Sequence, residues 1–148
     1  MSENCRPCEL CSNPGGILLW ASEDCRVIRV EDPHYPGFCR VIWTAHVQEM
    51  TDLDSDRRDF FMAVVFAVES VVRTLFRPDK INLASLGNMV PPLHWHVIPR
   101  WIDDRHFPEP IWGSVHNAMT PSRPEVSETA LRHALATALA HLDSRACI

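Results

Sequence analysis

The chain has 148 residues, of which 46% are hydrophobic and 22% are charged, which excludes an intrinsically disordered protein and fits one domain over residues 1–148. Its 14 basic and 19 acidic residues give a formal net charge of −5, which argues against nucleic acid as a partner. No apolar run approaches the roughly 20 residues of a membrane span, and the N-terminus resembles no secretory signal. We therefore expect a cytoplasmic protein with reduced thiols and no membrane partner.

Glycine and proline divide the first third of the chain into short strands. A cysteine-rich segment, residues 1–15, ends in a turn at Pro14-Gly15-Gly16. Strands are predicted at 17–20 and 26–30, joined by a polar turn. A third strand, 38–44, is β-branched and aromatic and apolar on both faces, which predicts a central position in a sheet.

One long helix follows these strands. Residues Asp52 to Ser55 supply helix-capping side chains, and an apolar stripe at helical spacing then runs until Pro78 stops it. The valines in this stripe lower helix propensity, so packing against a sheet must stabilise the helix. Two more strands are predicted at 81–87 and 93–98.

The C-terminal region predicts a second helix, from about residue 123 to 143. Ser122 to Glu125 has the pattern of a capping box with proline in the first turn, and leucines line one side of the residues that follow. The order of elements is therefore β, β, β, α, β, β, α. It predicts an α+β fold, with a mostly antiparallel five-stranded sheet, one long central helix and a C-terminal helix.

The densest chemistry lies in the last strand, at His94-Trp95-His96. Residues two apart in a strand point to the same face, so both imidazoles emerge together while Trp95 faces the other side. Imidazole suits nucleophilic attack, proton transfer and metal binding. We expect the pair to share an open, anion-receptive surface; the alternatives are two core histidines with satisfied hydrogen bonds or half of a metal site.

Leu93 to Arg100 resembles the signature strand of the histidine triad (HIT) family, in which three histidines alternate with apolar residues. The resemblance covers most of the chain, and residues 82–108 are similar to a bacterial branch described as diadenosine-tetraphosphate-hydrolase-like. The first histidine of the triad falls at Pro92. The resemblance implies that His94 is the nucleophile and that His96 helps to bind the phosphate. Other matching features are the Cys-x-x-Cys near the start, the strand before His46, the long helix and Asn82 to Asn88.

The implied activity is that of a nucleotide phosphohydrolase or transferase. It would cleave at the α-phosphate of a dinucleoside polyphosphate or nucleoside phosphoramidate, through a covalent nucleotidyl-histidine and without a catalytic cofactor. The expected partners are a purine nucleotide or dinucleotide and a second copy of the chain in a homodimer. Two alternatives stand beside it. One is a weakened, nucleotide-binding relative, because Pro92 offers no side-chain partner to orient His94; the other is a zinc-stabilised interaction protein.

The resemblance also implies nucleotide-binding residues. Asn82 matches an asparagine facing the ribose or phosphate, Asn88 and the amides around Gly87 are expected phosphate donors, and Asp32 matches an acid that accepts from ribose hydroxyls. Each has a simpler interpretation. The asparagines are also typical of turns, and Asp32 begins an Asp-Pro turn.

The sequence also indicates a possible structural zinc site near the N-terminus. Cys8 and Cys11 have the spacing that lets two thiolates share zinc. In relatives with this pair, the partners match His46 and the first triad histidine, so Pro92 leaves three ligands of four. The alternative is free thiols.

Charged residues follow the histidine strand. Arg100 is expected to meet a phosphate or a partner subunit, or to be a solvated cation. Asp103-Asp104-Arg105 is interpreted as a solvated turn.

Overall fold

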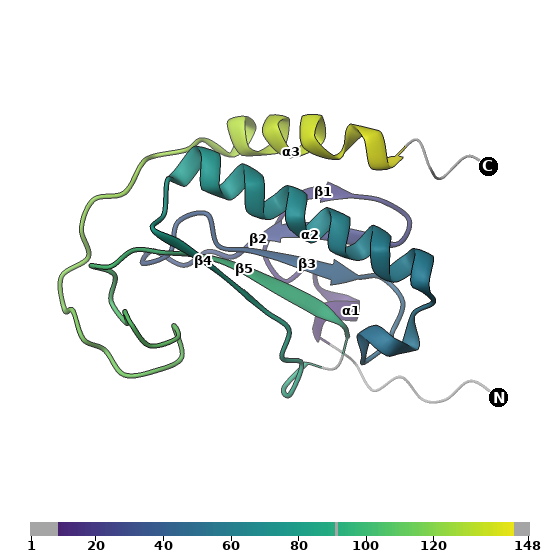
Figure 1. The fold of residues 1–148 in the computed structure, drawn as a ribbon, viewed down its shortest axis with the longest axis horizontal. Helices are drawn as coiled ribbons and strands as arrows, with labels where there is room; N and C mark the ends of the chain where they lie inside the picture. Colours follow the sequence, from purple (N-terminus) through teal and green to yellow (C-terminus); the bar gives the residue numbers. More distant parts are fainter. Residues whose placement is uncertain (1–8, 91, 144–148) are drawn as a thin grey trace.

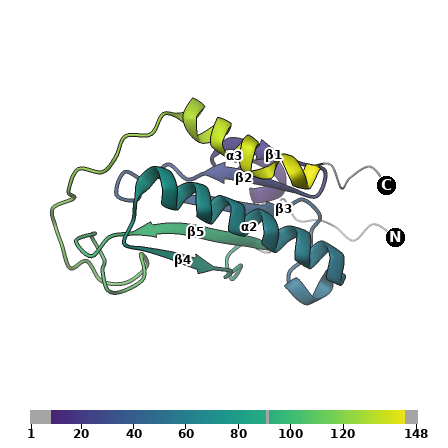
Figure 2. The same ribbon diagram turned by 45° about the horizontal axis from the view of Figure 1, so that its top comes forward.

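The computed structural model describes residues 9–90 and 92–143 as an antiparallel sheet with two long helices on one of its faces (Figures 1 and 2). The elements in chain order are α1 (Glu9–Ser12), β1 (Ile17–Ala21), β2 (Cys25–Arg29), β3 (Cys39–Trp43), the 3₁₀ turn η1 (Met50–Asp52), α2 (Ser55–Phe76), β4 (Lys80–Ala84), β5 (His94–Arg100) and α3 (Glu128–Asp143).

The five strands are ordered β1-β2-β3-β5-β4, and every neighbouring pair is antiparallel. The expected α+β fold is therefore confirmed. β3 is the middle strand, as its apolar character predicts. The crossover from β3 to β4 contains α2, which packs against β3 and β5, whereas α3 packs against α2 and β1.

The two helices begin differently from each other. α2 begins where the sequence predicts, because the Asp54 carboxylate accepts from the Arg57 backbone N–H at 2.9 Å. α3 begins at Glu128, so the predicted capping box at Ser122 to Glu125 is wrong. The Ser127 hydroxyl instead accepts from the Ala130 N–H at 3.1 Å.

Residues 121–127, before α3, are not helical, and Arg123 in this segment contacts the loop after β5. The Arg123 guanidinium stacks on the Trp101 ring at 4.3 Å and pairs with Asp103 at 2.8 Å. These two contacts tie the segment to the loop after β5.

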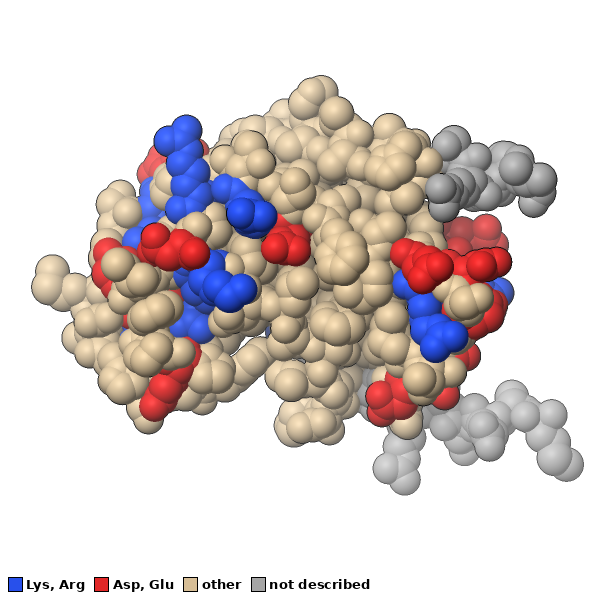
Figure 3. Space-filling model, viewed as in Figure 1, with Lys and Arg blue, Asp and Glu red and all other residues tan. Residues whose placement is uncertain are grey.

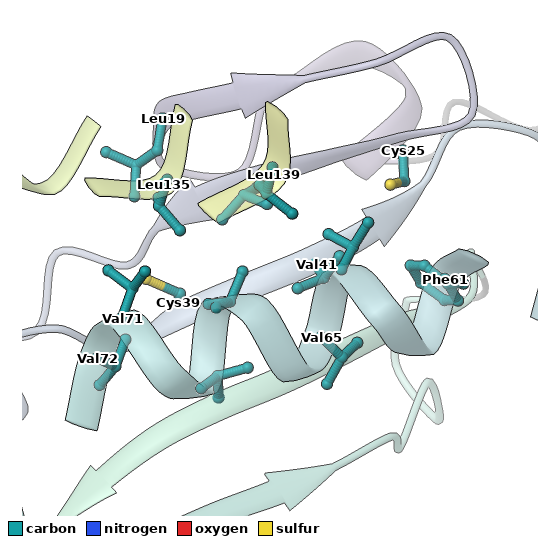
Figure 4. Packing of buried hydrophobic residues seen from close by; sticks show 14 of the residues in the cluster. Leu19, Cys25, Cys39, Val41, Phe61, Val65, Val71, Val72, Leu135 and Leu139 are labelled. Atoms are coloured by element: carbon teal, nitrogen blue, oxygen red, sulfur yellow. The ribbon is translucent and has the colours of Figure 1, made fainter. Parts of the chain in front are cut away.

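The main core lies between the sheet and the two helices. Val41 of β3, Val65 of α2 and Leu139 of α3 are fully buried there (Figure 4), and each such side chain contributes about 1.5–3 kcal/mol of transfer free energy. Cys25 and Cys39 are buried in the same layer, as expected of small apolar residues. Burial raises the pKa of the Cys39 thiol to about 12, so this thiol stays protonated and unreactive.

The opposite face of the sheet carries α1. Leu10 of α1 packs on Ile28 and Ile42, and the Arg26 guanidinium donates to the Leu10 carbonyl at 2.6 Å. Residues 1–8, which include Cys8, lie outside the described residues.

Charged side chains gather at the two ends of the helix-bearing face. In Figure 3, basic and acidic residues intermingle at both ends and leave a broad uncharged middle. Within the described ranges, no helix is long and apolar enough to cross a bilayer.

Candidate active site

β5 places two imidazoles on the sheet face opposite the long helices. His94 pairs with Ile42 and His96 with Arg40 across the antiparallel ladder with β3. Trp95 and Val97 alternate with them and pack into the helix-side core. The two imidazole ring centroids are 4.9 Å apart, so the predicted shared face is confirmed.

The imidazoles are more enclosed than the sequence predicts. His94 is 6% exposed and His96 is 5% exposed, so the expectation of an open hollow is wrong. The Phe38 ring lies 5.8 Å from the His96 ring, and the Trp112 ring lies 5.5 Å away with its edge toward it. Phe38 lies immediately before β3, whereas Trp112 lies in the irregular segment after β5, which strand periodicity does not describe.

Hydrogen bonding fixes which nitrogen of His94 carries its proton. The Nδ1 atom lies 2.7 Å from the backbone oxygen of Pro92. A carbonyl oxygen only accepts, so Nδ1 donates, and neutral His94 keeps its lone pair on Nε2. Pro92 was expected to deprive His94 of an orienting partner. The side chain of Pro92 offers His94 no hydrogen-bond partner, but the backbone oxygen of Pro92 supplies one.

Both imidazoles are held neutral. Burial lowers the pKa of His94, opposed by the bond to Pro92 and assisted by the positive charge of Arg40. Burial, then His94, then Arg40 lower the pKa of His96 to about 4. The His96 Nδ1 atom is buried and has no hydrogen-bond partner within the described part of the chain. The site thus offers an unprotonated Nε2 on His94 and, within the described residues, a ring nitrogen of His96 without a hydrogen-bond partner.

A buried ion pair anchors the segment that covers the site. The Arg100 guanidinium, only 2% exposed, donates to Asp104 at 2.7 and 3.1 Å and to the Glu109 carbonyl at 2.7 Å. Asp104, 1% exposed, also accepts from the backbone N–H groups of Trp101, His106 and Phe107. Arg100 is therefore no solvated cation, and Asp104 is no part of a solvated turn.

The same pair engages a tyrosine from the loop before β3. The Tyr35 hydroxyl donates to Asp104 at 3.1 Å and lies 2.6 Å from Nδ1 of His106. Burial and the Asp104 charge raise the pKa of Tyr35 to about 12. Burial alone would raise the pKa of Asp104, but the hydrogen bonds from Arg100 and from the backbone hold it below its usual value.

The predicted nucleotide-binding residues of β4 and its following loop have different surroundings. Asn82 is half-buried, and its side-chain oxygen accepts from Arg100 at 2.8 Å, which leaves its amide N–H groups as donors. Asn82 and Trp112 line a groove of about 590 Å³ along β4. Asn88 is exposed in the loop between β4 and β5, where Gly87 has a φ of +75° that favours glycine. Their proposed contacts with a nucleotide remain predictions.

Asp32 lies apart from this constellation. Its carboxylate accepts from the His34 backbone N–H at 2.8 Å, the geometry of an Asx turn. It lines a separate cavity of about 1040 Å³ with Arg29 and the segment before α3, and neither imidazole lines that cavity. The structure does not bring Asp32 to His94, so its contact with ribose stays a prediction.

The zinc prediction rests mostly on residues that the structure leaves undescribed. Cys8 is outside the described ranges, Cys11 lies in α1, and His46 is exposed in the loop after β3. Residues 9–90 and 92–143 contain no cluster of three metal-ligating side chains. However, Leu10 packs on Ile42, four residues before His46, so the helix that carries Cys11 lies over the end of β3.

Sequence reasoning missed Arg40 beside the imidazoles. Arg40 is opposite His96 on the same sheet face, and the alternation of β3 could have revealed it once the pairing with β5 was known. Trp112 reaches His96 through the fold of an irregular segment. The family resemblance implies that this aromatic segment, with Trp101, Phe107 and Trp112, helps to complete the active site; the alternative was a satellite hydrophobic cluster.

Comparisons with known proteins agree with this arrangement. The HIT domain profile matches residues 16–102. The AP-4-A phosphorylase of Mycobacterium tuberculosis is 31% identical over 88 residues, which cover 55% of this chain and 45% of that protein. The chain thus spans about half the length of the curated relatives it matches.

Solved structures share the fold over nearly the whole chain. A histidine triad protein from Marinobacter aquaeolei superposes with a TM-score of 0.70 at 26% identity, covering 93% of this chain and 97% of that one. A zinc-bound histidine triad family protein from Mycobacterium smegmatis has the same fold, with a TM-score of 0.57 at 22% identity, covering 94% of this chain and 97% of that one. With the profile match and the paired imidazoles of β5, these similarities show that the chain belongs to the HIT domain family.

Proposed function

We propose that the protein is a nucleotide hydrolase or transferase that acts at the α-phosphate of a nucleotide conjugate through His94. The observation that carries the proposal is the 2.7 Å contact between Nδ1 of His94 and the Pro92 oxygen, which leaves Nε2 as the free nucleophile. The similarity to an AP-4-A phosphorylase supports a dinucleoside polyphosphate as substrate, and a nucleoside phosphoramidate is the other candidate.

The chemistry follows from the geometry in two displacements. The Nε2 lone pair attacks the α-phosphorus, and the phosphorus–oxygen or phosphorus–nitrogen bond to the leaving group breaks. The leaving group departs with the bonding electrons and takes up a proton. The nucleotidyl-imidazolium keeps its Nδ1–H on the Pro92 carbonyl, which stabilises the new positive charge. Water then attacks the phosphorus, releases the nucleotide and restores neutral His94.

Trp112 must move for this chemistry to occur. The two imidazoles are nearly buried, and Trp112, which is 55% exposed, is the less tightly packed part of their cover. Phe38 is 3% exposed and is fixed in its own cluster with Tyr35 and Ile98. The proposal therefore includes displacement of the Trp112 side chain when a nucleotide binds.

Pro92→His tests whether the natural site is competent. Because the orienting contact uses the backbone of residue 92, restoring a histidine there is expected to change kcat by less than about tenfold. Steady-state kinetics with diadenosine tetraphosphate measure this. A gain of several hundredfold would instead support the weakened, nucleotide-binding alternative.

We also propose a structural zinc ion held by Cys8, Cys11 and His46. Thiolate and imidazole are the ligands that zinc prefers, and the ion would tie the N-terminal segment to the loop after β3. Elemental analysis of the purified chain is expected to find about one zinc per chain. Cys11→Ser should lower that content, with Cys25→Ser as the control; a metal-free native protein would contradict the site.

The remaining parts of the proposal concern assembly and location. β4 is the outer strand on one side of the sheet, so its outward backbone groups are open to a strand from a second copy, which supports a homodimer. We also propose a cytoplasmic location and no nucleic-acid or membrane partner, on the basis of the composition and charge of the sequence.

A further inference from the structure

Arg40 projects from β3 onto the face that carries the imidazoles. It is the direct cross-strand partner of His96, and its neighbour two residues along, Ile42, is the partner of His94. Directly opposed residues in an antiparallel pair have Cβ atoms about 4.5–5.5 Å apart. The Arg40 side chain therefore projects from the sheet beside His96, and His94 is the next residue of β5 on the same face.

The surroundings of Arg40 hold its guanidinium close to the candidate nucleophile. The side chain is half-buried, with its guanidinium carbon 5.7 Å from the centre of the Phe38 ring. Phe38 in turn contacts the His96 ring at 5.8 Å. Stacking on Phe38 restricts the flexible arginine to the imidazole side of the sheet.

The charges around the imidazoles favour an anion. The groups of β3 and β5 whose charges act on His96 are Arg40 and His94, and Arg40 also acts on His94. Phe38 and Trp112, which cover His96, are uncharged. The buried Nδ1 atom of His96 lacks a partner within the described ranges. A phosphate oxygen would satisfy that nitrogen and would meet the guanidinium, whose planar fork matches phosphate geometry.

We infer that Arg40 binds the substrate phosphate that His94 attacks. This inference rests on the proposed function and adds a residue to its site. Arg40 would place the phosphate against Nε2 of His94 and neutralise the charge that spreads over the phosphate oxygens in the transition state. In the free protein the same positive charge adds to burial in lowering the pKa of both imidazoles.

Isothermal titration with AMP and with adenosine tests the contact. Arg40→Gln is expected to weaken AMP binding about tenfold and to leave adenosine binding within about twofold, because only AMP carries the phosphate. Arg73→Gln makes the same charge change on α2, on the other side of the sheet, and should leave both affinities unchanged. Equal loss for AMP and adenosine, or no loss for either, would overturn the inference.

The pH profile of kcat/KM for diadenosine tetraphosphate provides the second readout. Removal of the Arg40 charge raises the pKa of His94, so the acidic limb should move to higher pH in Arg40→Gln and stay in place in Arg40→Lys. An unmoved limb in Arg40→Gln, together with an unchanged ratio of AMP to adenosine affinity, would overturn the inference. Failure of the proposed function is detected by a different experiment. If His94→Ala turns over diadenosine tetraphosphate as fast as the natural protein, the proposed function fails, whatever the ratio of AMP to adenosine affinity.

Discussion

His94→Ala is expected to lower kcat for diadenosine tetraphosphate by at least about a thousandfold, because the variant lacks the nitrogen that forms the covalent intermediate. The loss should appear in kcat more than in nucleotide affinity. His94 lies at the sheet face and not in the main core between the sheet and the long helices, so the fold should survive. Quantifying the nucleotide products by chromatography under saturating substrate measures the effect.

His133→Ala serves as the matched control for this experiment. His133 is exposed on α3, and its replacement should leave turnover at the level of the natural protein. Thermal unfolding of both variants checks that each is folded. Equal turnover by His94→Ala and the natural protein would remove His94 from the reaction.

Asp104→Ala is expected to destabilise the protein by about 3–5 kcal/mol, because it leaves the Arg100 charge buried without its carboxylate. The side chains of Arg100 and Asp104 are only 3% and 1% exposed, so water cannot replace the lost partner. The change also removes the acceptor for three backbone N–H groups in the loop that leads to Trp112. Urea-induced unfolding, followed by circular dichroism, measures the free energy of unfolding.

An exposed ion pair provides the comparison for that measurement. Glu128 and Arg132 on α3 are 41% and 44% exposed, and Glu128→Gln should cost at most about 1 kcal/mol, since solvent screens such pairs. If Asp104→Ala cost no more than Glu128→Gln, the Arg100 and Asp104 pair would not be the anchor of the covering segment.

The sequence predicts those parts of the fold that depend on local periodicity. The alternation around His94, Trp95 and His96 correctly places both imidazoles on one face, and the apolar stripe that ends at Pro78 correctly marks α2. Each pattern shows which side chains of one strand or helix share a face. It can be read from that element alone, without knowledge of the rest of the fold.

The parts that the sequence did not predict depend on contacts between distant segments. The start of α3 shifts because Arg123 is held by Trp101 and Asp103, which lie some twenty residues earlier. Arg100 and Asp104 look solvated in the sequence, yet their mutual hydrogen bonds permit burial. The resemblance implies a role for the segment of Trp112 at the active site, but the contact of Trp112 with His96 depends on the buried pair, which anchors the loop that leads to Trp112.

Pro92 shows how a side-chain comparison can mislead about chemistry. The residue that replaces a histidine has no imidazole, which suggested that His94 had lost its orienting partner. Its backbone oxygen accepts from Nδ1 of His94 at 2.7 Å, and any residue at that position offers the same atom. The tautomer of His94 therefore depends on main-chain geometry, which the identity of residue 92 does not reveal.

The most direct test is detection of the covalent intermediate. The protein is mixed with diadenosine tetraphosphate, quenched in base because a phosphorus–imidazole bond is acid-labile, and digested for mass spectrometry. The expected result is one adenylyl group on the peptide that contains His94, and none in His94→Ala. Turnover with no adduct, or with the adduct on another residue, would contradict nucleophilic attack by His94.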